Sequence, residues 1–102
     1  YLTYILIASL IVSCNSVTER MPYYEVQGID VSHYQSVVNW DTVVAQKMDF
    51  AFVKATEGEE HVDSLYVENW REIKRVGMKR GAYHFFRPSL SVFKQVKNFI
   101  RC

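Results

Sequence analysis

The sequence is short of cysteine, glycine and net charge, and each shortage excludes a class of function. Two cysteines and three histidines offer no spacing of the kind that binds zinc. No Gly-rich phosphate loop is present, which leaves a phosphate-binding α/β domain without support. The formal net charge is only +1 and lacks a clustered basic footprint, so nucleic acid is not an expected partner. The sequence therefore predicts neither a cofactor nor a zinc site.

A run long enough to cross a membrane is missing as well, although the chain opens on an apolar stretch. Residues 1–13 carry no charge and fall short of the roughly 20 apolar residues that a span needs, but they match the apolar part of a signal peptide. The stretch ends in Ile11-Val12-Ser13-Cys14, which resembles a bacterial lipobox. Residues 1–14 are therefore predicted to be a signal peptide, with Cys14 as the lipidation site and a lipid anchor in the membrane.

Two alternatives for this leader stay open, namely an ordinary cleaved signal and an uncleaved anchor. All three interpretations place the folded part outside the cytoplasm, in the bacterial cell envelope or secreted. A disulfide between Cys14 and Cys102 is conceivable in an oxidising compartment if Cys14 carries no lipid. Residues 15–25 are polar and are predicted to form a tether.

From Val26 onward, three strand-like segments alternate with three helical patterns. The predicted strands cover residues 27–32, 50–55 and 81–86. Apolar residues recur at helical spacing over residues 40–48, 66–76 and 92–100, and residues 59–64 form a loop. Strands that alternate with helices pair in parallel, so an α/β fold with three βα units is predicted.

The helical patterns also predict caps and buried faces. Asn39 or Asp41 caps the first helix, Asp63 or Ser64 the second, and Ser89 or Ser91 the third. Gly77 ends the second helix. Core positions are predicted for Trp40 and Trp70 and for the apolar stripe Val92, Val96, Phe99 and Ile100. A solvated helix face is predicted for Arg71, Lys74, Arg75, Lys79 and Arg80.

Polar side chains stand where the predicted strands end, and parallel α/β folds collect their active sites there. Asp30 lies between apolar neighbours in the first strand, where it serves chemistry or caps a turn. Glu57 ends the second strand, and strict alternation puts it on the face of Val53, opposite Lys54. A surface-loop role for Glu57 stays open.

The third strand and the segment after the first strand add further candidates. Tyr83 lies near the end of the third strand, at a site or in the core, and His84 points to the opposite face as a structural residue. His33 and Tyr34 either line a cleft or fill a loop. Two carboxylates on neighbouring strand ends fit glycoside hydrolysis, and they also fit a divalent metal, so their spacing leaves both open.

Three ordered motifs resemble the glycoside hydrolase family 25 lysozymes. They are Gly28–Gln35 with Asn39-Trp40, Phe50–Gly58, and Arg80–Phe86, with Asp63, Asn69 and Gly77 between them. The resemblance implies a flattened (β/α) TIM-like barrel that cuts the β-1,4 bond between N-acetylmuramic acid and N-acetylglucosamine, with peptidoglycan glycan strands as partner. A barrel of this kind takes about 250 residues, so residues 26–102 are predicted to be its truncated N-terminal part.

By this resemblance Asp30 matches the first active-site aspartate of the family, Glu57 its Thr-Glu-Gly glutamate, and Tyr83 a tyrosine at the third strand end. Asp30 and Glu57 are therefore predicted to be catalytic, and His33, Tyr34 and Tyr83 to bind substrate. The family's main acid, in an Asp-x-Glu motif, is expected soon after the third helix, and the printed sequence holds no such motif. A non-catalytic peptidoglycan-binding or degenerate lipoprotein is the alternative.

Overall fold

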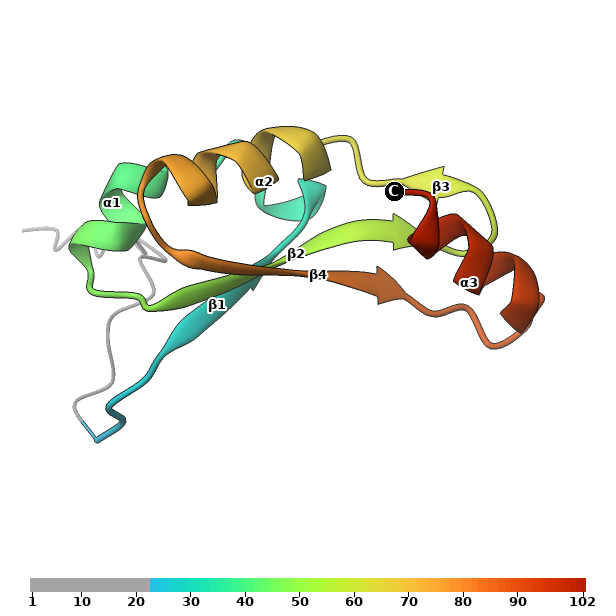
Figure 1. Cartoon of the computed structure of the whole chain (residues 1–102), viewed down its shortest axis with the longest axis horizontal. Coiled ribbons are helices and arrows are strands. Elements are labelled where there is room, and N and C mark those ends of the chain that lie inside the picture. The colour runs from blue at the N-terminus through green and yellow to red at the C-terminus, as the bar shows by residue number, and fades with distance from the viewer. Residues whose placement is uncertain (1–22) are drawn as a thin grey trace, which may run out of the picture.

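The structure is a computed structural model that describes residues 23–102, so the predicted signal peptide and Cys14 lie outside the described residues. Cys102 is exposed and forms no disulfide within residues 23–102. Among residues 23–102, no helix has the length and hydrophobicity that crossing a bilayer requires. Along the chain follow β1 (Gly28–Val31), the 3-10 helix η1 (His33–Gln35), α1 (Trp40–Ala45), β2 (Phe50–Glu57), β3 (His61–Val62), α2 (Tyr66–Arg75), β4 (Lys79–Phe85) and α3 (Val92–Ile100) (Figure 1).

The sheet is organised around β2, which pairs in parallel with β1 on one side and with β4 on the other. Gly28 lies opposite Phe50 in the first pair, and Phe50 lies opposite Lys79 in the second. Within the described chain β1 and β4 pair with no further strand, so both edges of the sheet are open. The three parallel strands, each followed by a helix, confirm the predicted α/β order.

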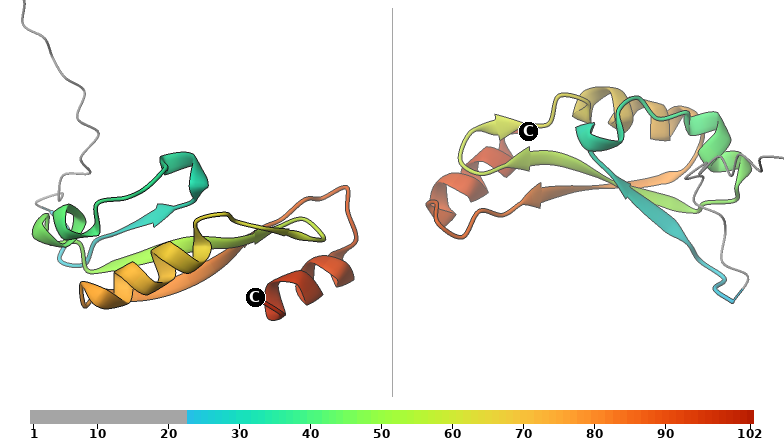
Figure 2. Two further views of the ribbon diagram at one scale, coloured as in Figure 1. Left: turned by 90° about the horizontal axis from the view of Figure 1, so that it is seen from above. Right: turned by 180° about the vertical axis from the view of Figure 1, so that it is seen from behind.

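Helices α1 and α2 cover one face of the sheet, as both views in Figure 2 show. The side chains from β1 and β2 that point to this face are small or branched, and Trp40 and Ile73 close over them. The Trp40 ring donates its Nε1 hydrogen to Asn69 Oδ1 at 3.2 Å, which satisfies the buried indole. The core consists of Val31, Trp40, Met48, Ala51, Val53, Ile73 and Met78. The predicted burial of Trp40 is confirmed, whereas Trp70 is only half-buried and stacks against Arg80.

The opposite face of the parallel strands carries no helix (Figure 1). Phe52 and Phe85 are about half exposed on it. A Cβ atom at Gly28 would overlap the Phe50 ring, and one at Gly81 would overlap the Phe52 ring. The two glycines therefore give these rings room to lie flat across the strands.

The helix ends follow local hydrogen bonding, with one departure from prediction. Asn39 caps α1 by accepting from Thr42 N at 3.1 Å. Gly77 ends α2 with φ 79°, while Gly77 N and Met78 N bond back into the last turn, as in a Schellman motif. The predicted cap of α2 by Asp63 or Ser64 is wrong, because Leu65 holds the N-cap position without a side-chain bond.

The predicted loop over residues 59–64 contains the short strand β3. Gly58 turns the chain with φ 59°, which brings Val62 opposite Thr56 and His61 opposite Glu57 in antiparallel pairing. The prediction missed this strand because only two residues pair, too few for a visible alternation. β3 extends the sheet beyond the end of β1 (Figure 1).

Helix α3 begins as predicted, but its polar side faces the protein and its apolar side faces solvent. Ser91 caps it by accepting from Lys94 N. The buried side chains are Gln95 and Asn98, whereas Val96 and Ile100 are 50% and 76% exposed. The predicted burial of the apolar stripe is therefore wrong. The amides of Gln95 and Asn98 satisfy backbone groups beneath the helix, and this directional bonding orients it.

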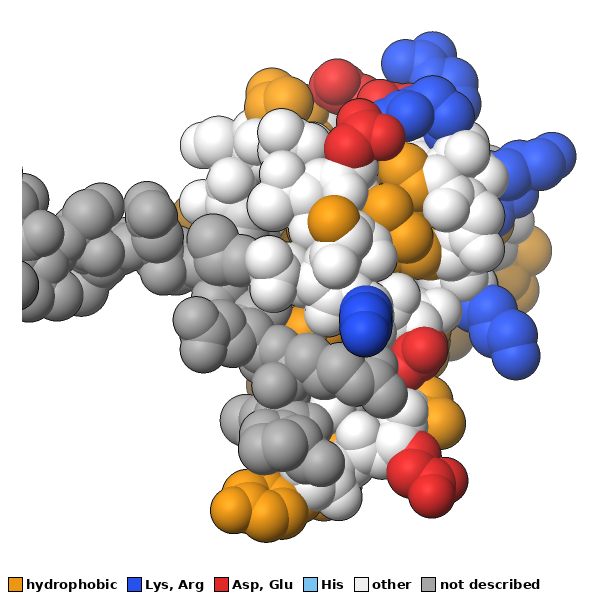
Figure 3. Space-filling view, turned by 90° about the vertical axis from the view of Figure 1, so that its left-hand side faces the viewer, with side chains coloured by type: hydrophobic (Ala, Val, Ile, Leu, Met, Phe, Trp, Pro, Cys, Tyr) orange, Lys and Arg blue, Asp and Glu red, His pale blue; other side chains and the backbone are white. Residues whose placement is uncertain are grey.

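Basic side chains gather at the end of the molecule that carries α1 and the last turn of α2 (Figure 3). Arg75 bonds Asp41 at 2.9 Å and Glu72 at 2.7 Å there. Four of the five basic residues that were predicted to lie on a solvated face are exposed, and Arg80 is half-buried against Trp70. These contacts confirm a solvated face.

Candidate functional site

A bulge in β2 decides which side chains reach the open face. Lys54 lies opposite Tyr83, and Thr56 lies opposite His84, so β2 holds one more residue than β4 at this point. Alternation is therefore broken between Lys54 and Thr56. The prediction that Glu57 lies opposite Lys54 is wrong, because the extra residue brings both to the same face. Lys54 Nζ donates directly to Glu57 Oε1.

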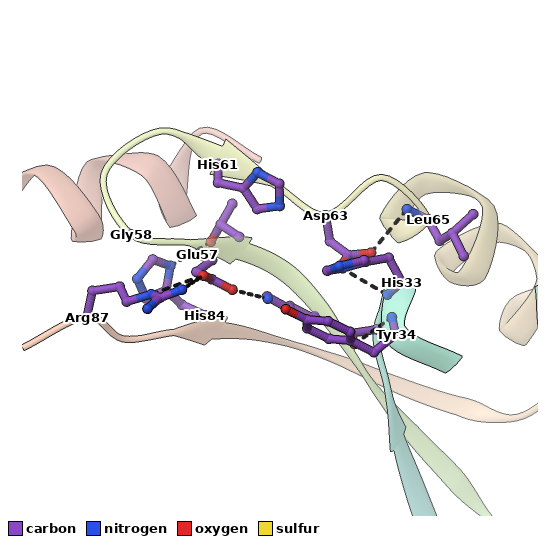
Figure 4. Close-up of polar contacts among 12 residues, drawn as sticks. His33, Tyr34, Glu57, Gly58, His61, Asp63, Leu65, His84 and Arg87 are labelled. Carbon is purple, nitrogen blue, oxygen red and sulfur yellow. Dashed lines mark hydrogen bonds and ion pairs between the residues drawn. The ribbon is translucent and has the colours of Figure 1, made fainter. Parts of the chain in front are cut away.

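Two cations hold the Glu57 carboxylate. Lys54 is 2% exposed and bonds one oxygen, while Arg87 bonds the other through Nη2 and through Nε at 3.0 Å (Figure 4). The hydrogen bond from Lys54, which has the larger effect, and those from Arg87 lower the pKa of Glu57 to about 2. Glu57 is consequently a carboxylate throughout the neutral range and has no proton to donate there. The pair also satisfies the buried Lys54 charge.

Asp30 and Tyr83 come from the two edge strands and belong to the same open face. Asp30 is exposed and lies in register with Phe52, and Tyr83 is half-buried in register with Lys54. Burial raises the pKa of Tyr83, and the negative charges of Asp30 and Asp63 raise it further. The phenol therefore stays protonated and can donate a hydrogen bond.

His33 and Asp63 join the end of β1 to the start of α2. Asp63 Oδ2 lies 2.6 Å from His33 Nδ1 and 3.1 Å from His33 N, while Oδ1 accepts from Leu65 N at 3.0 Å (Figure 4). Burial alone would raise the pKa of Asp63, but the three hydrogen bonds outweigh it and the pKa is lowered. Asp63 is thus an ionised carboxylate inside the protein.

Tyr34 stands next to this pair on η1. Its ring centroid lies 4.1 Å from that of His33, and 77% of the residue is exposed. Lys54 Nζ lies 5.7 Å from the Tyr34 ring centroid. The structure therefore brings together His33, Tyr34, Lys54 and Glu57. Asp30 lies further along the same face, in register with Phe52.

His84 lies on the helix-covered side, as predicted. Its Nδ1 is 2.7 Å from Thr56 Oγ1 and its Nε2 is 2.9 Å from Gln95 Oε1. Gln95 Oε1 also accepts from Arg87 N, so this oxygen is an acceptor and His84 carries its hydrogen on Nε2. The ring links β2, β4 and α3.

Sequence reasoning missed the partners of the predicted residues. Lys54 gave a signal, since a lysine inside an apolar strand needs a partner. Asp63 was interpreted only as a cap, and Arg87 follows the third strand without any distinguishing pattern. Local sequence does not reveal which distant carboxylate an arginine meets.

A shallow hollow lies where β2 ends, between the turn that follows it and the segment after β4. It is lined by Glu57, Gly58, Glu59, Glu60, His61, Arg87 and Leu90. A second hollow lies between β1 and α1, with mainly apolar walls, and Tyr34 forms part of its lining. No three His, Cys, Asp or Glu side chains within residues 23–102 converge as metal ligands.

Comparison with known proteins defines the class. The sequence model of glycosyl hydrolases family 25 matches residues 29–102. The chain therefore belongs to glycosyl hydrolase family 25, and its described residues form part of the α/β fold of that family. The resemblance seen in the three motifs is confirmed.

Individual relatives agree with this assignment to the family. The chain is 41% identical over 83 residues to the Escherichia coli protein YegX, covering 76% of this chain and 30% of that protein. It is 48% identical over 66 residues to lysozyme M1 of Streptomyces globisporus, covering 65% of this chain and 22% of that lysozyme. The structure of a family 25 glycosyl hydrolase from Bacillus anthracis superposes with a TM-score of 0.75 at 41% identity, over 81% of this chain and 38% of that one. The chain thus spans about a third of the length of these relatives.

Proposed function

We propose that the protein is a peptidoglycan hydrolase that cleaves the β-1,4 bond between N-acetylmuramic acid and N-acetylglucosamine. The family match and the lysozyme relative support this function. The observation that carries it is that Asp30, Glu57 and Tyr83 lie on one face of the sheet, on three adjacent strands. Active sites of parallel α/β folds gather at the carboxyl ends of the strands, and Glu57 ends β2 there.

The charges assign different roles to the two predicted catalytic carboxylates. Asp30 is exposed and free to face the reacting sugar, where its charge stabilises an oxocarbenium-like centre. Glu57, with a pKa of about 2 and two cationic partners, fixes Lys54 and Arg87 as hydrogen-bond donors toward sugar hydroxyl and acetamido groups. The Tyr83 phenol stays protonated and donates a hydrogen bond to the bound sugar. The general acid that protonates the leaving oxygen must be a group other than Glu57.

A second candidate is peptidoglycan binding without hydrolysis. The observation that favours it is the low pKa of Glu57, about 2, which leaves this carboxylate without a proton to donate in the neutral range. In that case the Lys54–Glu57–Arg87 cluster and Tyr83 would hold the glycan, and Asp30 would have no chemical task.

Sedimentation with purified peptidoglycan and the release of new reducing ends separate the two candidates. A hydrolase both binds and releases reducing ends, and Asp30→Asn lowers release by at least about a hundredfold while binding and thermal stability are kept. Asp41→Asn, on the remote face, is the matched control. Binding without release assigns the second candidate, and a protein that neither binds nor releases overturns both.

The domain division and export belong to the same proposal. We propose that residues 1–14 direct export, that Cys14 carries lipid, and that residues 15–25 tether the domain to the membrane facing the cell wall. Labelled palmitate should enter the protein in cells and be lost in Cys14→Ser. Incorporation that persists in this variant would contradict the lipidation site.

A further inference from the structure

Asp63 is the only carboxylate residue among the buried residues of the described chain, and the proposed chemistry gives it no role. Its side chain is 0% exposed, although burying a charge is unfavourable. Three hydrogen bonds compensate, and two of them come from His33. Asp63 therefore fixes both the backbone and the ring of His33, the third residue after Asp30.

The hydrogen bond to Asp63 sets the tautomer of His33. An ionised carboxylate only accepts hydrogen bonds, so His33 Nδ1 carries the hydrogen that lies between the two groups. The other ring nitrogen, Nε2, has no hydrogen-bond partner among residues 23–102. The side chain is 33% exposed, so Nε2 is available to a ligand.

Tyr34 depends on the ring that Asp63 fixes. The imidazole lies against one side of the Tyr34 ring, with centroids 4.1 Å apart and planes tilted by 35°. Ser32 Oγ accepts from Tyr34 N at 3.2 Å and holds the backbone. The Tyr34 side chain extends toward Glu57, while most of its surface stays in solvent (Figure 4). An aromatic ring that is supported from behind and exposed in front is a surface on which a pyranose ring can stack.

We propose that Asp63 is a positioning residue that, through His33, fixes Tyr34 as the aromatic platform for an N-acetylated hexosamine ring beside the Lys54–Glu57 pair. The proposal rests on the proposed function, since it names the wall of that site. Fixing the ring before binding removes part of the ordering cost that a free tyrosine would incur.

A purely structural role for Asp63 is the competing explanation, because Asp63 also bonds Leu65 N at the start of α2. A double-mutant cycle separates the two roles. If Asp63 acts through Tyr34, then removing Tyr34 abolishes any further effect of changing Asp63. A structural role gives independent effects, visible in unfolding and not in sugar affinity.

The test is an NMR titration of the whole chain with a tetrasaccharide of alternating N-acetylglucosamine and N-acetylmuramic acid. Asp63→Asn and Tyr34→Ala should each weaken binding roughly three- to tenfold, and the double variant should bind no more weakly than Tyr34→Ala. Tyr34→Phe should keep the affinity, and Asp41→Asn should bind as the parent does. Nitrogen-15 spectra of the histidine rings should show the Nδ1–H form of His33 populated in the parent and reduced in Asp63→Asn.

The remaining outcomes are decisive as well. Equal affinity in Asp63→Asn and the parent, or additive losses in the double variant, would overturn the positioning role while leaving the proposed function intact. A parent chain that binds neither the tetrasaccharide nor peptidoglycan overturns both. If Asp63→Asn does not fold, His33→Gln removes the ring behind Tyr34 while keeping the Asp63–Leu65 bond, and it should give the same loss of affinity.

Discussion

Helices α2 and α3 both follow a strand and both have an apolar and a polar side, yet they meet the sheet in opposite ways. α2 presents Ile73, which is fully buried, to the apolar face of β2. α3 presents Gln95 and Asn98, and leaves Val96 and Ile100 in solvent. Amphipathic spacing thus identifies a helix without telling which of its sides faces the sheet.

The difference has a physical origin in what each helix covers. Beneath α2 lie Val53 and other apolar side chains, so burial of apolar area is the available gain. Beneath α3 lie the carbonyl groups of Gly58 and His61 and the ring of His84, and these need hydrogen-bond partners. α2 is therefore held by packing, and α3 by directional bonds.

The largest expected effect comes from the packed helix. Ile73→Ala should lower the free energy of unfolding by about 2–5 kcal/mol, because it removes fully buried methyl groups and leaves a cavity. Urea denaturation followed by circular dichroism measures it. Val67→Ala, on the exposed side of the same helix, should change stability by less than about 0.5 kcal/mol. Similar losses in both variants would contradict the packing role of Ile73.

Gln95 tests the directional attachment. Gln95→Leu should cost about 1–3 kcal/mol, although leucine is more apolar, because Arg87 N and O and His84 Nε2 lose their partner. Ile73→Leu, a swap of equal volume on α2, should cost less than about 1.5 kcal/mol. A stabilising Gln95→Leu would show that burial, and not bonding, holds α3.

Acid should loosen α3 before α2, since Arg87, at the start of the segment leading into α3, bonds Glu57. The pKa of Glu57 is about 2 in the fold against an ordinary 4.5, so its stabilising effect is full above pH 4.5 and is lost as the pH falls toward 2. Hydrogen exchange between pH 6 and 3 should show protection of α3 falling relative to α2. In Glu57→Gln this relative change should disappear, and its persistence would point to another group.

The smallest effect belongs to the exposed stripe of α3. Val96→Gln should leave the free energy of unfolding within about 0.5 kcal/mol, because the side chain already lies half in solvent. The same change should reduce self-association in sedimentation velocity, since it interrupts an exposed apolar patch. A large loss of stability would place Val96 in a packed contact.

Much of the fold was predictable because strands and helices alternate with clear periods. The parallel order and the stop at Gly77 followed from residue types alone, and the cap of the first helix was narrowed to Asn39 or Asp41, of which the structure has Asn39. The site was predictable in part: Asp30 and Tyr83 lie on the two strands that flank β2, whereas alternation predicted Glu57 and Lys54 on opposite faces and the structure has them on one face. Alternation assumes an unbroken pleat, and no residue in Phe50–Glu57 marks the bulge.

The orientation of α3 and the role of Asp63 were out of reach for a related reason. Both depend on partners more than 25 positions away, Gly58 for Asn98 and His33 for Asp63. Spacing within one segment carries no information about such pairs. Long-range polar pairs become visible only when the strands are placed side by side.

The bulge divides β2 into two segments whose side chains meet different surroundings. Up to Lys54 the strand follows the pleat that packs against α1 and α2, and a substitution there is judged by the core. After the bulge the phase is shifted, so Thr56 serves the α3 side and Glu57 the open face. A single additional residue thereby lets the end of the strand that carries Glu57 change in composition without altering how its first half is packed.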